Sequence, residues 1–132
     1  MNQRSLTMHA YEEPDRYVLT LDGELDLGSV PAFEAAAARL SSMGRGELLV
    51  DISDVAFIDS TGIRAILTVK ADCEQRSCGF TMTHGSEQTE RVLELTRLLE
   101  RLPFRQRPQK RFRREIELWP QDELEQAEGA AG

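Results

Sequence analysis

The stretch from Phe57 to Arg64, FIDSTGIR, is the segment of this chain that is best suited to chemistry. An apolar run ends on an acid, two hydroxyl residues and a glycine, and apolar residues then resume at helical spacing. This order predicts a strand-to-helix corner with Ser60 at the start of the helix, where unpaired backbone amides and the positive end of the helix dipole can accept a phosphate. Two interpretations stay open. Either Ser60 is a helix cap and Asp59 a turn acid, or Ser60 carries a phosphoryl group.

Catalysis by this segment is not expected. A serine nucleophile needs a base within hydrogen-bond reach, and the two histidines, His9 and His84, have no ordering acid in a recognisable arrangement. We expect both histidines at the surface or at strand ends. The chain has no GxxxxGK[ST] loop and no GxGxxG motif after a strand, which argues against a nucleotide site. Cys73 and Cys78 lack CxxC spacing, which predicts free thiols. We therefore expect no enzyme activity, no cofactor and no metal.

The composition predicts one domain without a nucleic-acid or membrane partner. A chain of 132 residues with 40% hydrophobic residues can build one core of ordinary size. The net charge of -7 argues against general nucleic-acid binding, which depends on clustered positive charge. The first residues contain no apolar signal region, and no apolar run is long enough to span a bilayer. We expect a cytoplasmic location.

The motif needs a scaffold, and the chain around it predicts alternating strands and helices. Strands are expected at residues 6–11, 17–21, 47–52 and 78–83. Helices are expected at about 30–40, from the corner at Ser60 to about Gln75, and from a cap at Ser86 to a stop at Pro103. This order predicts an α/β fold in which a single layer of mixed β-sheet has helices packed on it.

Turn residues and apolar spacing add detail to this scheme. The first two strands should form an edge hairpin, with a break at Asp22-Gly23 after the second strand. Ser29 should cap the first helix, with Pro31 in its first turn. The run 47–52 should be a central strand that ends in a loop at Ser53-Asp54. The predicted buried helix faces are Phe33, Ala36, Ala37 and Leu40 in the first helix, Ile63, Ile66, Leu67 and Ala71 in the second, and Val92, Leu95, Leu99 and Leu102 in the third.

The composition changes near residue 105, so we expect a domain at 1–104 and a charged tail at 105–132. The tail is first basic and then acidic, with no acid from Arg101 to Arg114 and no base from Glu115 to Glu128. One interpretation is a solvated, partly disordered tail, because little apolar area offsets the entropy of ordering it. The other is an added strand or docking segment formed by Phe112, Ile116, Leu118 and Trp119.

The run LLVDISDVAFIDSTGIRAIL resembles the STAS family, and within it the anti-sigma factor antagonists. The stretches GELDLGSVPAF before it and GFTMTHGSEQTERVLELTRL after it extend the resemblance over about residues 6 to 104. Its most specific element is Asp59-Ser60-Thr61-Gly62, which follows Asp51-Ile52 by a short apolar link. Gly23-Glu24-Leu25-Asp26 adds a weaker match.

The resemblance implies a regulator that switches partners. In that family the unphosphorylated protein binds an anti-sigma factor with serine kinase activity and frees a sigma factor, phosphorylation ends the binding, and a phosphatase resets the protein. Ser60 corresponds to the phosphorylated serine. The partner-binding residues that the resemblance implies are Asp26, Asp59, Ser60, Thr61, Gly62 and Arg64.

The physical chemistry of the motif agrees with such a switch. A phosphate beside Asp59 would create like-charge repulsion and a desolvation cost in an interface. Gly62 would let the corner turn without strain and let a kinase approach the backbone. Asp26 has an alternative role, because an acid after a strand often caps the following turn.

Three points stay open at this stage. The first is whether Thr61 is also modified. The second is whether the protein forms a homodimer. The third is an alternative function, in which the chain is a STAS-type scaffold or a small-ligand sensing module in a larger signalling complex and Ser60 is a bystander.

Overall fold

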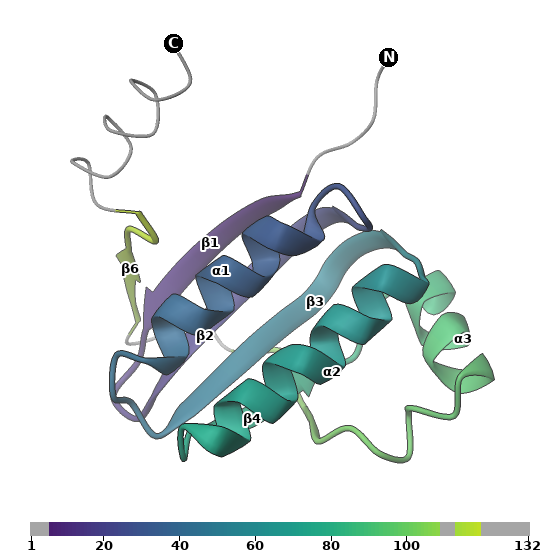
Figure 1. Cartoon of the computed structure of the whole chain (residues 1–132). Helices are drawn as coiled ribbons and strands as arrows, with labels where there is room; N and C mark the ends of the chain where they lie inside the picture. Colours follow the sequence, from purple (N-terminus) through teal and green to yellow (C-terminus); the bar gives the residue numbers. More distant parts are fainter. Residues whose placement is uncertain (1–5, 109–112, 120–132) are drawn as a thin grey trace, which may run out of the picture.

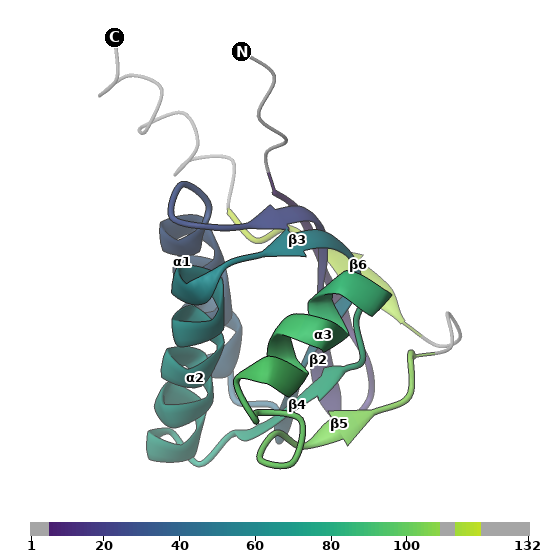
Figure 2. The same ribbon diagram turned by 90° about the vertical axis from the view of Figure 1, so that its right-hand side faces the viewer.

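A computed structural model describes residues 6–108 and 113–119, and it contains a mixed sheet with helices on it. The elements are β1 (Thr7–Glu12), β2 (Arg16–Leu25), α1 (Val30–Ser41), β3 (Glu47–Ile58), α2 (Ser60–Gln75), β4 (Gly79–Thr83), α3 (Glu87–Leu95), β5 (Phe104–Arg105) and β6 (Arg114–Ile116). The sheet has six strands in the order β5-β4-β3-β2-β1-β6. Helices α1 and α2 lie side by side over one face of it (Figures 1 and 2). The predicted α/β fold is confirmed.

The sheet is parallel from β2 to β5 and antiparallel at β1. Strand β1 forms the expected hairpin with β2, and the Glu13 amide closes the turn on the Arg16 carbonyl at 2.9 Å. This hairpin is not at the edge of the sheet, because β6 pairs with the other side of β1. The prediction of an edge hairpin is therefore wrong.

Strands β2 and β3 run further than the sequence predicts. The expected break at Asp22-Gly23 is a shift in register within β2, where Gly23 has a φ of 122° and the pairing with β3 continues to Leu25 and Ile58. The loop expected at Ser53-Asp54 is also absent, since β3 remains a strand from Glu47 to Ile58. The shift in register interrupts the pairing between β2 and β3 only locally, so the polar residues there do not end either strand. Because β2 and β3 are parallel, the segments after Leu25 and Ile58 begin at the same end of the sheet.

The predicted buried face of α1 is confirmed, and that of α2 is confirmed in part. Phe33, Ala36, Ala37 and Leu40 are all buried under α1. Helix α2 buries Ile63 and Ile66 as expected, but Ala65, Val69 and Cys73 complete its buried face. Leu67 is 39% exposed and Ala71 is also exposed, because both lie on the outer side of the helix.

Helix α3 starts as predicted and ends early. The Ser86 side chain accepts a hydrogen bond from the Thr89 amide at 3.3 Å, which confirms the cap. The helix stops at Leu95, and Arg97 has a φ of 61°, a left-handed conformation that ends a helix. The predicted buried face is therefore wrong at Leu95, which is 78% exposed, while Leu93 is fully buried in its place.

The segment after residue 104 contributes to the sheet through β5 and β6. Strand β6 pairs with β1, Leu118 is buried, and Ile116 and Trp119 pack against the core. Opposite charges support the pairing, with Arg114 2.9 Å from Glu12. This part of the tail matches the expectation of an added strand, and Phe112 lies outside the described residues.

The two thiols and the two histidines lie where the sequence predicts. Cys73 and Cys78 are free and buried, and burial raises the pKa of Cys73 to about 12, so it is a poor nucleophile at neutral pH. His9 and His84 are exposed and lie beside Glu115 and Glu90. No helix among residues 6–108 and 113–119 has the length and apolar character needed to cross a membrane.

Candidate functional site

The motif forms the predicted corner between β3 and α2, and Asp59 is its cap. Asp59 has an extended backbone, with φ -112° and ψ -174°, and its Oδ1 accepts a hydrogen bond from the Gly62 amide at 2.9 Å. Ser60 is the first residue of the helix. The interpretation of Ser60 as the helix cap is therefore wrong, because the carboxylate before it already does this work.

The two hydroxyl groups of the motif differ in their surroundings. Ser60 is exposed, and its hydroxyl makes no hydrogen bond to any residue that the structure describes. Thr61 is half-buried, and its hydroxyl donates to Oδ1 of Asp59. Of these two neighbours, Ser60 presents a free hydroxyl to solvent and Thr61 does not.

Asp59 is a carboxylate at neutral pH. Burial raises its pKa, but hydrogen bonds from the Thr61 hydroxyl and from the backbone amides of Gly62 and Thr61 outweigh that effect, and the net pKa is lowered. An anion therefore already occupies the helix N-terminus. The expectation that these amides would accept a phosphate on Ser60 needs correction, since the Gly62 amide is taken by Asp59.

Gly62 is required for packing and not for the turn. A Cβ at this position would lie 2.4 Å from the carbonyl oxygen of Leu25 and 2.8 Å from Cγ1 of Ile58. The described glycines with positive φ are Gly23 and Gly44, so Gly62 needs no special backbone conformation. It is also buried, which means that a partner protein or a kinase would not touch it directly. Both sequence-based reasons for this glycine are corrected.

Asp26 lies in the neighbouring turn, between β2 and α1. The Asp59 amide donates to the Leu25 carbonyl at 3.3 Å. This hydrogen bond ties the corner after β3 to the turn after β2 (both strands are labelled in Figure 1). Oδ1 of Asp26 accepts from the amides of Gly28 at 3.0 Å and Ser29 at 3.2 Å, so its turn-capping role is confirmed. Such a role does not conflict with partner binding at the surface.

The predicted cap at Ser29 is wrong in detail. Its hydroxyl donates to the Glu24 carbonyl at 2.8 Å and accepts from the Asp26 amide at 3.0 Å, and it makes no bond to the first turn of α1. Pro31 does lie in that turn, as predicted. The hydroxyl therefore holds the turn that carries Asp26 beside the motif.

Exposed apolar side chains accompany these polar groups. Leu27, next to Asp26, is 74% exposed, and Leu67 on α2 is 39% exposed. Ser60, Arg64 and Leu67 follow one another at helical spacing of four and three residues, which places them on one exposed stripe of α2. Leu27 was not among the predicted site residues, and Leu67 was predicted in the buried face of its helix. Leu67 lies four residues after Ile63 and so fits the apolar spacing of a buried helix face, which gave no signal of its exposure. Leu27 belongs to no apolar pattern, because it lies between Asp26 and Gly28 in a predicted turn.

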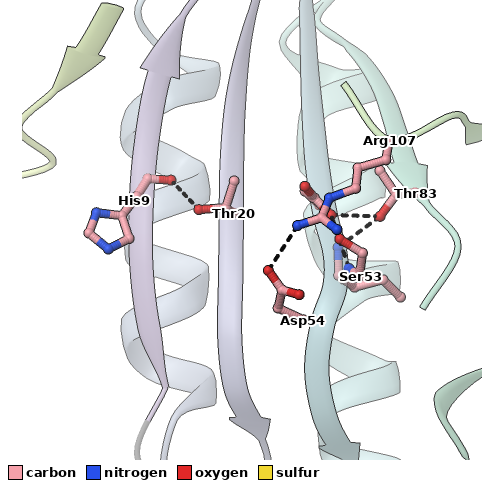
Figure 3. A network of polar contacts seen from close by, with 8 residues as sticks. His9, Thr20, Ser53, Asp54, Thr83 and Arg107 are labelled. Carbon is pink, nitrogen blue, oxygen red and sulfur yellow. Dashed lines mark hydrogen bonds and ion pairs between the residues drawn. The ribbon is translucent and has the colours of Figure 1, made fainter. Parts of the chain in front are cut away.

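A separate polar network lies on the face of the sheet opposite α1 and α2 (Figure 3). Oδ1 of the buried Asp51 accepts a hydrogen bond from the Thr83 hydroxyl at 3.0 Å, and that hydroxyl accepts one from the Ile52 amide at 3.0 Å. Arg107 pairs with Asp54 at 3.2 Å across the same face. No group of acids, histidines and cysteines that could hold a metal occurs in the described part of the chain. These hydrogen bonds link β3 to β4 on the face of the sheet that α1 and α2 do not cover.

The fold and the motif place the chain in a known family. A family model described as the Mlab STAS domain matches residues 8–103, and the chain belongs to the STAS domain family. An anti-sigma-B factor antagonist of Staphylococcus epidermidis is 24% identical over 94 residues, which cover 71% of this chain and 87% of the relative.

Solved structures of similar proteins share the fold. An anti-sigma factor antagonist from Mycobacterium paratuberculosis has a TM-score of 0.68 and 24% identity, over 75% of this chain and 84% of that one. The anti-sigma factor antagonist SpoIIAA in its unphosphorylated form has a TM-score of 0.62 and 16% identity, over 94% and 96%.

Proposed function

We propose that this chain is an anti-sigma factor antagonist that works by switching partners. Its unphosphorylated form binds an anti-sigma factor with serine kinase activity and so releases a sigma factor. Phosphorylation of Ser60 by that kinase ends the binding, and a phosphatase restores it. Similar proteins that carry the name of anti-sigma factor antagonist support this role.

The observation that carries the proposal is the state of the Ser60 hydroxyl. It is exposed at the first position of α2 and forms no hydrogen bond within the described residues, so a kinase can reach it without unfolding the helix. The Asp59 carboxylate stands before it in the chain, and Arg64 follows one turn later on the same face.

The same surroundings explain why a phosphate would end the binding. The exposed side chains of Leu27 and Leu67 suit burial against a protein partner. A phosphoserine adds about -1.5 to -2 charges at neutral pH. Since Asp59 already fills the helix N-terminus, the new charge would stay at the surface beside a carboxylate, where a partner would have to desolvate it.

The test combines intact-mass spectrometry with a pulldown. The protein is incubated with ATP and each purified anti-sigma kinase from the same cell, and wild type is compared with Ser60→Ala and Ser60→Asp. We expect one phosphate in wild type and none in Ser60→Ala, with binding kept by Ser60→Ala and reduced at least tenfold by Ser60→Asp. Ser42→Asp is the matched control. It adds the same charge to an exposed serine at the C-terminal end of α1, whereas the turn that carries Asp26 precedes the N-terminal end of that helix.

A different outcome would favour the alternative function. If no kinase adds a phosphate and Ser60→Asp binds its partners like wild type, the chain is better described as a STAS-type scaffold or small-ligand module. Light scattering on the same samples tests the homodimer, which the scaffold hypothesis would require to be stable and unaffected by Ser60→Asp.

A further inference from the structure

We infer that Asp59 restricts phosphorylation to Ser60 by holding the hydroxyl of Thr61. This inference rests on the proposed function, and it assigns Asp59 as a positioning residue. Two adjacent hydroxyl residues stand at the start of α2, and the proposed kinase has to modify one of them for the switch to have a single off state.

The geometry separates the two candidates through one oxygen atom. Oδ1 of Asp59 accepts from the Thr61 hydroxyl and, at 2.9 Å, from the Gly62 amide. The amide fixes the carboxylate in place, and the carboxylate then fixes the Thr61 side chain, which is half-buried. Ser60 receives no such contact from the described residues, and its side chain is free to turn toward a partner.

The chemistry of phosphoryl transfer makes this difference matter. A bond forms between the hydroxyl oxygen and the γ-phosphorus of ATP, the bond from that phosphorus to the β-phosphate oxygen breaks, and ADP leaves. The hydroxyl proton goes to the catalytic base of the kinase. Thr61 has its proton directed at Asp59, so it would first have to break that hydrogen bond and turn outward. The Ser60 hydroxyl makes no hydrogen bond within the described residues, so it can turn toward a kinase without breaking one.

Charge strengthens the hold on Thr61. Its hydroxyl donates to an ionised acceptor, and such charge-assisted hydrogen bonds are stronger than those between neutral groups. The lowered pKa of Asp59 keeps that acceptor ionised at the neutral pH at which a kinase works. An asparagine at this position would keep the acceptor oxygen and lose the charge, whereas an alanine would remove both.

The experiment maps phosphates by peptide mass spectrometry after incubation with ATP and the purified anti-sigma kinases. We expect no phosphate on Ser60→Ala, because Thr61 remains held. The double variant Ser60→Ala with Asp59→Ala should gain phosphate on Thr61, at least tenfold above Ser60→Ala. The double variant with Asp59→Asn keeps the acceptor oxygen and loses its charge, so it should gain less phosphate on Thr61 than the Asp59→Ala double variant does. Circular dichroism checks that each variant is folded.

Each remaining result counts against the inference, and three of them are distinct from failure of the proposed function. Phosphate on Thr61 in wild type or in Ser60→Ala would show that Asp59 does not protect this hydroxyl. No phosphate on a folded Ser60→Ala, Asp59→Ala variant would show that position alone selects Ser60. If Asp59→Ala does not fold, a folded Ser60→Ala, Asp59→Asn variant with no more phosphate on Thr61 than Ser60→Ala counts against the inference. A wild-type protein that accepts no phosphate defeats the proposed function and this inference together.

Discussion

Gly62 lies so close to Leu25 that a Cβ on the glycine would stand 2.4 Å from the leucine carbonyl oxygen. The same carbonyl accepts a hydrogen bond from the Asp59 amide at 3.3 Å. One peptide group at the end of β2 therefore positions the start of α2. The motif and the turn that carries Asp26 are held together by this contact.

Replacement of this glycine should be costly for folding. Gly62→Ala places a methyl group against backbone atoms that cannot move without shifting β2 or α2, and we expect a loss of roughly 1–3 kcal/mol in the free energy of unfolding. Urea denaturation followed by circular dichroism measures it. Gly46→Ala is the matched control, since its Cβ would meet nothing closer than the Asp15 carbonyl oxygen at 3.7 Å. Equal stability of the two variants would contradict the packing role.

The charge of Asp59 should make stability depend on pH in one direction. Its pKa is lowered in the folded state, so its contribution is present above the unfolded-state pKa of about 3.9 and is lost as the pH falls through the lower folded-state value. We expect Asp59→Ala to lose about 1 kcal/mol at pH 7, as for other helix N-caps. That difference from wild type should shrink at low pH.

Unfolding curves at neutral and acidic pH measure this effect. Asp22→Ala is the control, because Asp22 is exposed and makes no side-chain hydrogen bond within the described residues. A difference between wild type and Asp59→Ala that stays constant from pH 7 to about pH 2 would rule out a role for the carboxylate charge.

Two buried threonines on β4 offer a paired test of the polar network behind the sheet. The Thr83 hydroxyl has two partners, Asp51 and the Ile52 amide, while Oγ1 of Thr81 has none in the described structure. Thr83→Val should cost roughly 1–3 kcal/mol in the free energy of unfolding, because it leaves buried groups without a partner. Thr81→Val should be neutral or stabilising. The reverse order of stabilities would refute the network as drawn in Figure 3.

The docking of β6 can be tested with two leucines of opposite exposure. Leu118 is 8% exposed and Leu95 is 78% exposed. Leu118→Ala should lower the free energy of unfolding by about 2 kcal/mol, at the low end for buried leucines because the site lies at the edge of the sheet. Leu95→Ala should change it by less than about 0.5 kcal/mol. Thermal or urea unfolding distinguishes the two, and similar values for both would mean that the segment after Arg113 does not contribute to the folded domain.

Much of the scaffold follows from local patterns. The apolar spacing of Phe33, Ala36, Ala37 and Leu40 predicts the buried face of α1 because a helix of regular period turns these residues to one side. The same reasoning fails for α3, where Arg97 adopts a left-handed backbone and ends the helix before the apolar pattern ends. The predicted lengths of β2 and β3 are also wrong, because local residue types do not show which residues pair with a neighbouring strand. Polar residues such as Ser53 and Asp54 look like a loop, but pairing with β2 keeps them in β3.

The sequence by itself determined the motif, its place between a strand and a helix, and the choice of Ser60 as the residue of interest. These three features depend on residue types and on spacing between residues close in sequence, and both can be read directly from the sequence. The tertiary structure decided how the motif is held. The contact of Gly62 with Leu25 joins the first turn of α2 to the end of β2. The hydrogen bond from Thr61 to Asp59 is local, and it forms where the Gly62 amide fixes the carboxylate. The contact between Gly62 and Leu25 depends on how separate segments pack together, and no local pattern encodes it.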